Sequence, residues 1–312
     1  MIMGLYIYVW VLLLQCRWLQ LYLFLFSPCF RGESINMKVV RIKLDRIVLF
    51  FIASLFALIF LLPMVYTFVS SLKSIEEIFT IPIKWIPDKI HIENFILPFT
   101  KKNFGIYFIN STIVAIAVTI NQLFFSSLGG YSLAKFNYRG KDFLFITVLL
   151  TMMVPVEVTL VPLAIIVRNL GWMNTYWGLI IPVMITPFGI FWMRQFIITI
   201  PNDYAESGRV EGVGEFKIFL KIILPMCQPA IGALAIFTFM GNWNQLLWPL
   251  IVASKDRFRT IPVGLVAFEG EFFTPFNELF AMSITAVLPT LIIFLILKGR
   301  LIKGMAMVGI KG

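Results

Sequence analysis

The segment Tyr204–Ile231 reads YAESGRVEGVGEFKIFLKIILPMCQPAI and decides how the rest of the chain is interpreted. Acidic and basic side chains lie close together in its first half, whereas the chain as a whole is 60% hydrophobic and only 13% charged. Long apolar stretches lie on both sides of the segment. It is therefore expected to be a polar connection between two membrane-spanning helices.

The composition sets the class of protein. A mean hydropathy of +0.91 over 312 residues does not fit a soluble domain, whose surface needs more polar side chains. The net charge of +10 comes from Lys and Arg residues scattered between apolar runs, without a basic face for nucleic acid. These features predict an all-α, polytopic membrane protein that has the lipid bilayer, and no nucleic acid, as a partner.

Six apolar runs are long enough to cross about 30 Å of hydrocarbon, at residues 46–70, 104–134, 142–168, 175–197, 222–252 and 277–299. If the Met37 end lies inside, the inside segments carry fifteen of the 26 Lys and Arg residues and the outside segments nine. The positive-inside rule then predicts that the chain from Met37, the C-terminus and the quoted segment are all cytoplasmic.

Residues 1–36 do not fit this topology. Their apolar run is interrupted by Gln15, Arg17 and Gln20, and it lacks the basic start and small-residue cleavage site of a signal peptide. Met37 is followed by KVVRIKLDRIVLFF, a basic lead into an apolar span. We therefore expect residues 1–36 to be an upstream extension and residues 37–312 to form one six-span domain.

The residues needed for catalysis or metal binding are scarce. Cys16, Cys29 and Cys227 lack metal-ligand or redox spacing, and His91 is the only histidine. The sequence contains no Gly-x-x-x-x-Gly-Lys-Ser/Thr phosphate loop. A membrane-embedded enzyme is therefore not indicated, and energy for any transport is expected to come from another subunit.

The residues just before the quoted segment and those at its start predict a short helix. Pro201, Asn202 and Asp203 suit a helix N-terminus, where a missing N–H and a negative charge are tolerated or favoured. Ala205, Gly208 and Gly212 follow at intervals of three and four residues, which predicts one face with little side-chain bulk. Such a face would let another protein surface approach closely.

The alternative for this segment is a solvated connector, in which Glu206 and Arg209 form an exposed pair worth a few tenths of a kcal/mol. The wider spacing favours a specific motif instead. It resembles the EAA motif, E-A-A-x3-G-x9-I-x-L-P, of permease subunits in binding-protein-dependent ABC importers. The motif positions are Glu206, Ser207, Gly208, Gly212, Ile222, Leu224 and Pro225, with Ser207-Gly208 in place of Ala-Ala and Glu211 in place of the usual Asp.

Three further segments extend the resemblance over residues 37–312. They are GGYSLAKFNYRGKDFLF at 129–145, LGWMNTYWGLIIP at 170–182 and KGMAMVGIKG at 303–312. They are similar to segments of the sugar permeases of the maltose-system second-subunit type. The last one matches the K-G-x-x-x-G-x-x-K-G tail of that family, which separates it from permeases for peptides, phosphate or polyamines.

The resemblance implies a six-transmembrane-helix type I ABC importer permease in the cytoplasmic membrane of a bacterium or archaeon. Its partners would be a second permease subunit, two ATPase subunits and an extracytoplasmic solute-binding protein. The chain itself would not be an enzyme and would hold no cofactor, since the ATPase subunits would bind ATP and Mg²⁺. The segment at about 198–221 would couple to an ATPase subunit through Ala205, Glu206, Ser207, Gly208, Glu211, Gly212, Ile222, Leu224 and Pro225. The substrate would be an oligosaccharide, a disaccharide or a glycerol phosphate.

Candidate substrate-pathway residues lie in two places. In MGNWNQLLWPL (240–250), amides next to aromatic rings could recognise sugar hydroxyls, or could bond neighbouring helices within an interfacial aromatic belt. The residues concerned are Asn242, Trp243, Asn244, Gln245 and Trp248. Glu157, between Pro155 and Pro162, is the one acid well inside an apolar run, at midplane or near the outer surface.

Two alternatives to a sugar importer stay open at this stage. An ion-coupled secondary transporter would carry internal repeats and several intramembrane ionisable residues, whereas the sequence contains no repeat and only Glu157. An ABC importer permease for a solute other than a sugar would share the coupling segment.

Overall fold

The computed structural model describes residues 38–268 and 274–308, and side chains within 47–268 and 274–299. The predicted extension 1–36, Met37 and the last residues of the C-terminal tail lie outside the described residues. Within them, every regular element is helical. In chain order these are α2 (Lys38–Ser70), α3 (Ile75–Ile78), α4 (Glu93–Lys101), α5 (Phe104–Lys135), α6 (Lys141–Met152), α7 (Val156–Asn169), α8 (Tyr176–Ile180), η1 (Ile181–Val183), α9 (Pro187–Ile198), α10 (Asp203–Val210), α11 (Glu215–Ile218), the π-helical turn η2 (Phe219–Ile223), α12 (Leu224–Met226), α13 (Gln228–Trp243), α14 (Leu247–Val252), η3 (Asp256–Phe258), α15 (Ile261–Ala267) and α16 (Phe276–Val308).

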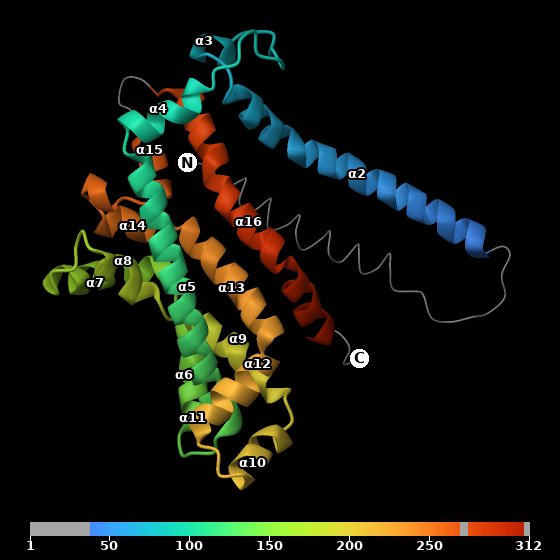
Figure 1. Cartoon of the computed structure of the whole chain (residues 1–312), viewed down its shortest axis with the longest axis vertical. Helices are drawn as coiled ribbons and strands as arrows, with labels where there is room; N and C mark the ends of the chain where they lie inside the picture. Colours follow the sequence, from blue (N-terminus) through green and yellow to red (C-terminus); the bar gives the residue numbers. More distant parts are fainter. Residues whose placement is uncertain (1–37, 269–273, 309–312) are drawn as a thin grey trace. The chain divides into compact units, whose positions relative to one another are not determined.

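The helices account for the six predicted spans in two ways (Figure 1). Three are continuous helices long and apolar enough to cross a membrane: Ile47–Ser70, Phe104–Lys135 and Phe276–Gly299. The other three are pairs of helices bent at a short break, by 100° between α6 and α7, by 43° between η1 and α9, and by 81° between α12 and α13. The count of six is reached when each bent pair is taken as one span.

Prolines lie at each of these breaks. Pro155 precedes α7, Pro187 opens α9, and Pro229 stands in the first turn of α13. Proline lacks an N–H to donate to the preceding turn and disfavours the helical conformation of the residue before it. The predicted run 222–252 therefore contains several elements, since it begins inside η2 and ends in the separate helix α14.

The chain falls into two compact units, one of residues up to Phe95 with Thr274–Ile284, and one of Ile96–Phe273 with Thr285–Gly312. In the first unit, the buried Asn94 side chain donates to Ser71 O at 3.0 Å and to Lys73 O at 2.9 Å. Its Oδ1 accepts from Asn277 Nδ2 at 2.8 Å. These bonds join the end of α2 to the start of α16 within that unit.

The second unit is organised around α5, which packs along α9 and α13. Gly130 permits the close contact with α9, because a Cβ there would lie 2.7 Å from Arg194 N and 2.8 Å from Met193 Cβ. Met193 and Ile197 of α9 are fully buried in the resulting core. The position of α9 against α5 therefore depends on the absence of a side chain at residue 130.

A polar contact with α5 fixes the position of the start of α9. Gln122 of α5 is fully buried, and its Nε2 lies 2.9 Å from Thr186 Oγ1 while its Oε1 accepts from Thr186 N at 2.7 Å. Gly189, in the first turn of α9, leaves room for this amide, since a Cβ would lie 1.9 Å from Gln122 Nε2. The buried amide is thus satisfied by the helix end that it positions.

The opposite half of α5 holds the loop between α14 and α15. Asn103 Nδ2 donates to Asp256 Oδ2 at 2.8 Å, and the Tyr107 hydroxyl donates to Asp256 Oδ1. The hydrogen bonds from Tyr107 and Asn103 and the charge of Arg259 hold the pKa of the Asp256 carboxyl below its usual value. Asn110 Nδ2 adds bonds to the backbone oxygens of this loop at 2.8 and 2.9 Å.

Candidate coupling site

The predicted short helix is present as α10, and it ends in a defined capping motif. Gly212 N donates to Arg209 O at 3.0 Å, and Val213 N donates to Gly208 O at 2.9 Å, which is the Schellman arrangement. Gly212 has a φ of 74°, a left-handed conformation that glycine adopts without steric cost. The chain therefore turns sharply after α10 and begins α11 at Glu215.

One face of α10 is turned toward the chain's own helices. Ala205 is 1% exposed and Gly208 is buried. A Cβ at Gly208 would lie 3.1 Å from the Ile218 side chain and 3.2 Å from the Ile222 side chain. The small residues therefore permit α10 to pack tightly on α11 and η2.

The prediction that Ala205, Gly208 and Gly212 form one free face for a partner is wrong. The first two are covered by the chain itself, and Gly212 lies beyond the helix end, with open space around its Cβ position. Sequence spacing gave the shared face of Ala205 and Gly208 correctly, but it could not tell which surface covers it. The covering surface is formed by Ile218 and Ile222, which follow the turn at Gly212.

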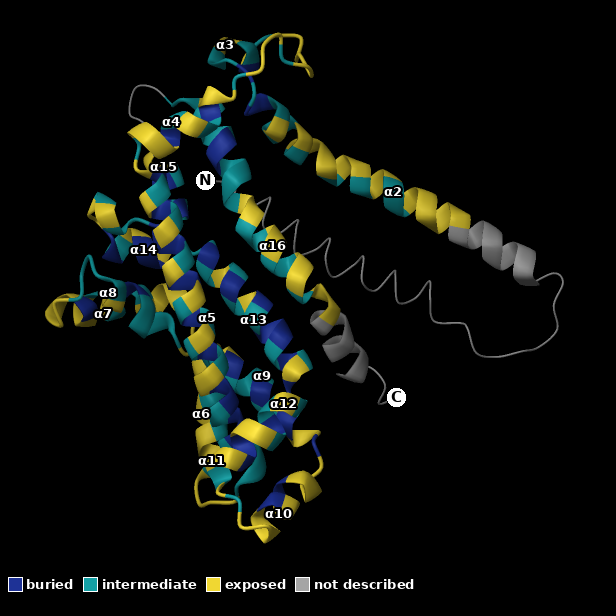
Figure 2. Cartoon of the chain, in the orientation of Figure 1, coloured by how far each residue is buried: buried dark blue, intermediate teal, exposed yellow. Residues whose placement is uncertain are grey.

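The opposite face of α10 is open, as Figure 2 shows for the helix at one end of the second unit. Glu206, Ser207 and Glu211 are exposed there, as the sequence-based candidates for docking require. Val210, which the sequence interpretation missed, is 89% exposed, and Tyr204 is 48% exposed. An apolar residue at the end of an otherwise polar helix is the signal that could have identified Val210.

The last part of the EAA motif packs internally. Ile222 and Leu224 are half-buried and pack against the hydrophobic core formed with Met193, Ile197 and Ile223. They therefore contribute to the chain's own packing, and their predicted contact with an ATPase subunit stays a prediction. Pro225 is exposed, in the first turn of α12 and close to the 81° bend.

Charged groups hold α10 at both ends. After it, Arg209 Nε lies 2.5 Å from Glu215 Oε1, and Glu215 Oε2 accepts from the Tyr131 hydroxyl at 3.0 Å. Before it, Lys135 Nζ donates to Ile200 O and to Asn202 Oδ1, the latter at 2.8 Å. The ion pair of Arg209 is thus formed with Glu215 and not with Glu206, the partner expected from helical spacing.

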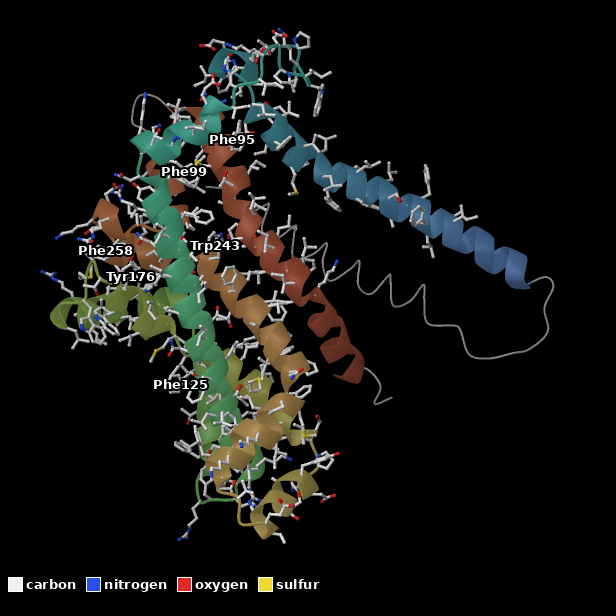
Figure 3. All side chains as sticks on the ribbon, in the orientation of Figure 1. Phe95, Phe99, Phe125, Tyr176, Trp243 and Phe258 are labelled. Carbon is white, nitrogen blue, oxygen red and sulfur yellow. The ribbon has the colours of Figure 1, made fainter. Side chains whose placement is uncertain are left out.

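The aromatic residues of the candidate pathway are part of the core. Trp243, labelled in Figure 3, is 2% exposed, and its Nε1 donates to Ala286 O at 2.9 Å. Its ring centroid lies 5.5 Å from that of Phe108 and 5.6 Å from that of Phe239. Trp248 is 1% exposed and donates to Gly178 O at 3.0 Å. Their proposed role as substrate contacts is wrong, because ring and N–H are already engaged within the chain.

The amides beside them are more accessible. Asn242, Asn244 and Gln245 are half-buried at the end of α13. The Nδ2 atoms of Asn242 and Asn244 donate back to their own helix, to Thr238 O at 2.8 Å and Met240 O at 2.7 Å. These bonds leave the amide oxygen and a second N–H of each Asn for a solute, and the pathway role stays a prediction.

Glu157 lies in the first turn of α7, next to the 100° bend, and its side chain is exposed. A carboxylate in the first helical turn is favoured by the helix dipole, which gives Glu157 a structural reason for its position. Its role in a solute pathway also stays a prediction.

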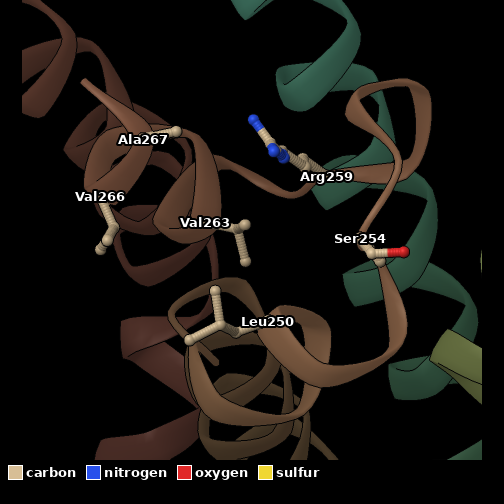
Figure 4. A pocket seen from close by; sticks show the side chains of 7 residues that line it. Leu250, Ser254, Arg259, Val263, Val266 and Ala267 are labelled. Atoms are coloured by element: carbon tan, nitrogen blue, oxygen red, sulfur yellow. The ribbon is translucent and has the colours of Figure 1, made fainter. Parts of the chain in front are cut away.

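A cavity of about 240 Å³ lies beside the loop that α5 holds, where Leu250 and Val263 face each other (Figure 4). It is smaller than the usual sites for small molecules. Arg259, on its rim, is already paired with Asp256 at 3.1 Å. Its lining is mostly apolar, formed by Leu250, Ala253, Ser254, Arg259, Val263, Val266 and Ala267.

Comparison with known proteins places these features in a family. Residues 126–301 match the model of the binding-protein-dependent transport system inner membrane component. The arabinooligosaccharides transport system permease protein AraQ of Bacillus subtilis is 33% identical, over 90% of this chain and 99% of that protein. The diacetylchitobiose uptake system permease protein NgcG of Streptomyces coelicolor is 31% identical, over 79% and 83%.

Two further matches agree with these. The sn-glycerol-3-phosphate transport system permease protein UgpE of Brucella abortus is 30% identical, over 78% of this chain and 89% of that protein. The fold is similar to a chain in the crystal structure of a bacterial ABC transporter involved in the import of the acidic polysaccharide alginate. The TM-score is 0.75, with 19% identity and coverage of 86% of this chain and 100% of that one. The expected transport family and membrane fold are confirmed, and the chain belongs to the binding-protein-dependent transport system inner membrane components.

Proposed function

We propose that this chain is a permease subunit of an ATP-driven importer for sugars and that the exposed face of α10 docks on an ATPase subunit. The observation that carries the proposal is the two-sided construction of α10. Its small residues Ala205 and Gly208 are packed on the chain's own helices, while Glu206 and Val210 point away from them. A short helix held on one side and open on the other can transfer a displacement from a partner to the spans.

The partners follow from the family description. A binding-protein-dependent system needs an extracytoplasmic solute-binding protein, and a second permease would complete the pathway. Two ATPase subunits would bind ATP and Mg²⁺. In this arrangement α10, the start of the chain from Met37 and the C-terminus lie in the cytoplasm of a bacterial or archaeal cell, and the spans lie in its cytoplasmic membrane. The fifteen Lys and Arg residues on that side, against nine on the other, support this orientation.

The mechanism requires that ATP favours one arrangement of the ATPase pair over another. Closure of that pair would draw the coupling helices of the two permeases together and turn the pathway from inward-facing to outward-facing. An ion-coupled secondary transporter would need no such docking helix, and membership in this family speaks against it.

Sugars and their derivatives are the solutes that the relatives support. The names of the relatives specify arabinooligosaccharides, diacetylchitobiose and sn-glycerol 3-phosphate. We use these three compounds as the test panel, in uptake assays with the complete transporter and its solute-binding protein in proteoliposomes. Failure of all three would remove the support for the sugar class while leaving the docking of α10 to be tested separately.

Val210→Asp is expected to reduce recovery of the ATPase subunits with the tagged permease by at least about tenfold, because it replaces the most exposed apolar side chain of the proposed contact with a charge. The reference is the ATPase subunit that co-purifies with the unaltered chain from its own cells. Val210→Ile keeps the apolar character and is the matched control. Full recovery with Val210→Asp would show that this face does not dock.

Asn244→Leu is expected to weaken solute affinity during uptake by about tenfold to a hundredfold, if its amide oxygen accepts a hydroxyl of the solute. Recovery of the ATPase subunits and their basal ATP hydrolysis should be unchanged, since Asn244 follows the end of α13 that is away from the connection to α10. Uptake is measured over a range of concentrations of the transported panel compound. An unaltered concentration dependence would remove Asn244 from the pathway.

A further inference from the structure

The last two turns of α5 contact both ends of α10, although α5 is neither of the helices that adjoin α10 in the chain. Tyr131 and Lys135 lie four residues apart and therefore on one face of α5. Lys135 Nζ reaches the segment before α10 through Ile200 O and Asn202 Oδ1. Tyr131 reaches the segment after it through Glu215.

Glu215 is the shared acceptor at the second of these contacts. Its Oε1 lies 2.5 Å from Arg209 Nε, and its Oε2 lies 3.0 Å from the Tyr131 hydroxyl and 3.4 Å from an Arg209 Nη. Arg209 belongs to α10, Tyr131 to α5, and Glu215 begins α11. One carboxylate therefore joins three helices through charge-assisted bonds, which are stronger than neutral ones.

The burial of these groups makes the contact directional. Tyr131 is 2% exposed and its ring packs on Phe136 and Phe219 at 5.4 Å, so the hydroxyl has a fixed position. The Arg209 and Glu215 side chains are 37% and 42% exposed, so they lie on the solvent side of that ring. A movement of Arg209 with α10 is thus opposed by a buried residue of α5.

α5 is also continuous from this contact to the other side of the unit. Its 32 residues form an uninterrupted helix. Tyr107 and Asn110 in its first turns, with Asn103 just before it, bind Asp256 and the following loop. The spans that adjoin α10 in the chain, by contrast, are the bent pairs ending in α9 and beginning with α11. A continuous helix, whose backbone hydrogen bonds run without a break, transmits a displacement along its axis with less loss than a pair of helices joined at a bend.

We propose that Tyr131 and Lys135 are positioning residues through which α5 receives the movement of α10, with Glu215 as the connecting group. We call Tyr131 and Lys135 the α5 clamp. The inference rests on the proposed function of α10 and adds the route by which its displacement enters the membrane domain. Removing the clamp should leave the outer face of α10 able to dock, and it should separate ATP hydrolysis from transport.

The test uses Tyr131→Phe and Lys135→Met, each of which removes a donor, and Glu215→Gln, which removes the negative charge of the acceptor; all three keep the approximate shape of the side chain. The complete transporter is assayed in proteoliposomes for recovery of ATPase subunits, ATP hydrolysis and uptake of the transported panel compound. We expect normal recovery, continued hydrolysis and about a tenfold lower uptake per ATP in the double variant Tyr131→Phe with Lys135→Met. Lys135→Arg should keep most of the uptake per ATP that Lys135→Met loses, because arginine retains a donor at this position.

Matched controls lie on the adjacent connection between α5 and α6. Tyr138→Phe and Lys141→Met make the same chemical changes outside the contacts of α10 and should leave the ratio unaltered. An unchanged ratio in the clamp variants would overturn the proposal. A proportional loss of recovery, hydrolysis and uptake would also overturn it, since it would identify the clamp as an anchor for folding. Failure of the docking proposal itself would instead appear as normal ATPase recovery with Val210→Asp.

Discussion

Replacing Gly208 by leucine is expected to reduce ATP-driven uptake by at least about tenfold. A Cβ at this position would already lie 3.1 Å from Ile218 and 3.2 Å from Ile222, and leucine adds three more carbon atoms beyond it. Ile218 is fully buried, so a shift of its side chain must disturb the residues packed around it. The larger side chain therefore forces α10 away from α11 and η2, so that a docked partner no longer displaces the spans.

The measurement is uptake in proteoliposomes together with the amount of chain inserted in the membrane, which should be unchanged. Gly214→Ala is the matched control, because Gly214 has a φ of −63° and open space at its Cβ position. Gly212→Ala should have an intermediate effect, since a φ of 74° costs a residue with a Cβ about 1–2 kcal/mol. Normal uptake with Gly208→Leu would show that the contact with Ile218 and Ile222 does not hold α10 in the working transporter.

Gly130→Val is expected to destabilise the second unit by more than any change at α10. The Cβ would lie 2.7 Å from a backbone nitrogen of α9, and a backbone atom cannot be relieved by a rotamer change. The helices α5 and α9 must separate, and the buried core of Met193 and Ile197 opens. We expect a loss on the order of 3 kcal/mol or more, with little chain recovered in folded form.

The neighbouring glycine provides the control for this second prediction. A Cβ at Gly129 would lie 3.5 Å from the Ile190 side chain, an ordinary contact, so Gly129→Ala should be tolerated. Folded chain is measured by size-exclusion chromatography in detergent, followed by thermal unfolding of the main peak. Equal recovery and equal unfolding temperatures for Gly129→Ala and Gly130→Val would contradict the close packing of α5 on α9.

The sequence predicted the membrane class, the six apolar runs and the short helix before the fifth run, because hydropathy and helical spacing are local properties. It could not predict that three runs are bent, since the prolines 155, 187 and 229 interrupt a helix without lowering the mean hydropathy of a window. It also assigned Trp243 to the pathway, because burial against Phe108 and Ala286 depends on residues far away in the chain.

The coupling segment shows the same limit at the level of single residues. The spacing of Ala205 and Gly208 predicted a small face, and only the return of the chain through Ile218 and Ile222 reveals what covers it. The i, i+3 rule paired Arg209 with Glu206, whereas the turn at Gly212 brings Glu215 within 2.5 Å. Tyr131 and Lys135 offered no signal, because their contacts join segments more than sixty residues apart.

The contact between Gly208 and Ile222 has a consequence for how sequences of this kind drift over evolutionary time. Both residues belong to the EAA motif. Their side-chain sizes are therefore constrained by packing within this chain, in addition to any contact of the motif with a partner. A mutation that enlarges residue 208 would survive selection only where residue 218 or 222 had first become smaller. Residue 218 or 222 is thus expected to become smaller before residue 208 becomes larger. A descendant with a larger residue at 208 should therefore have a smaller residue at 218 or 222.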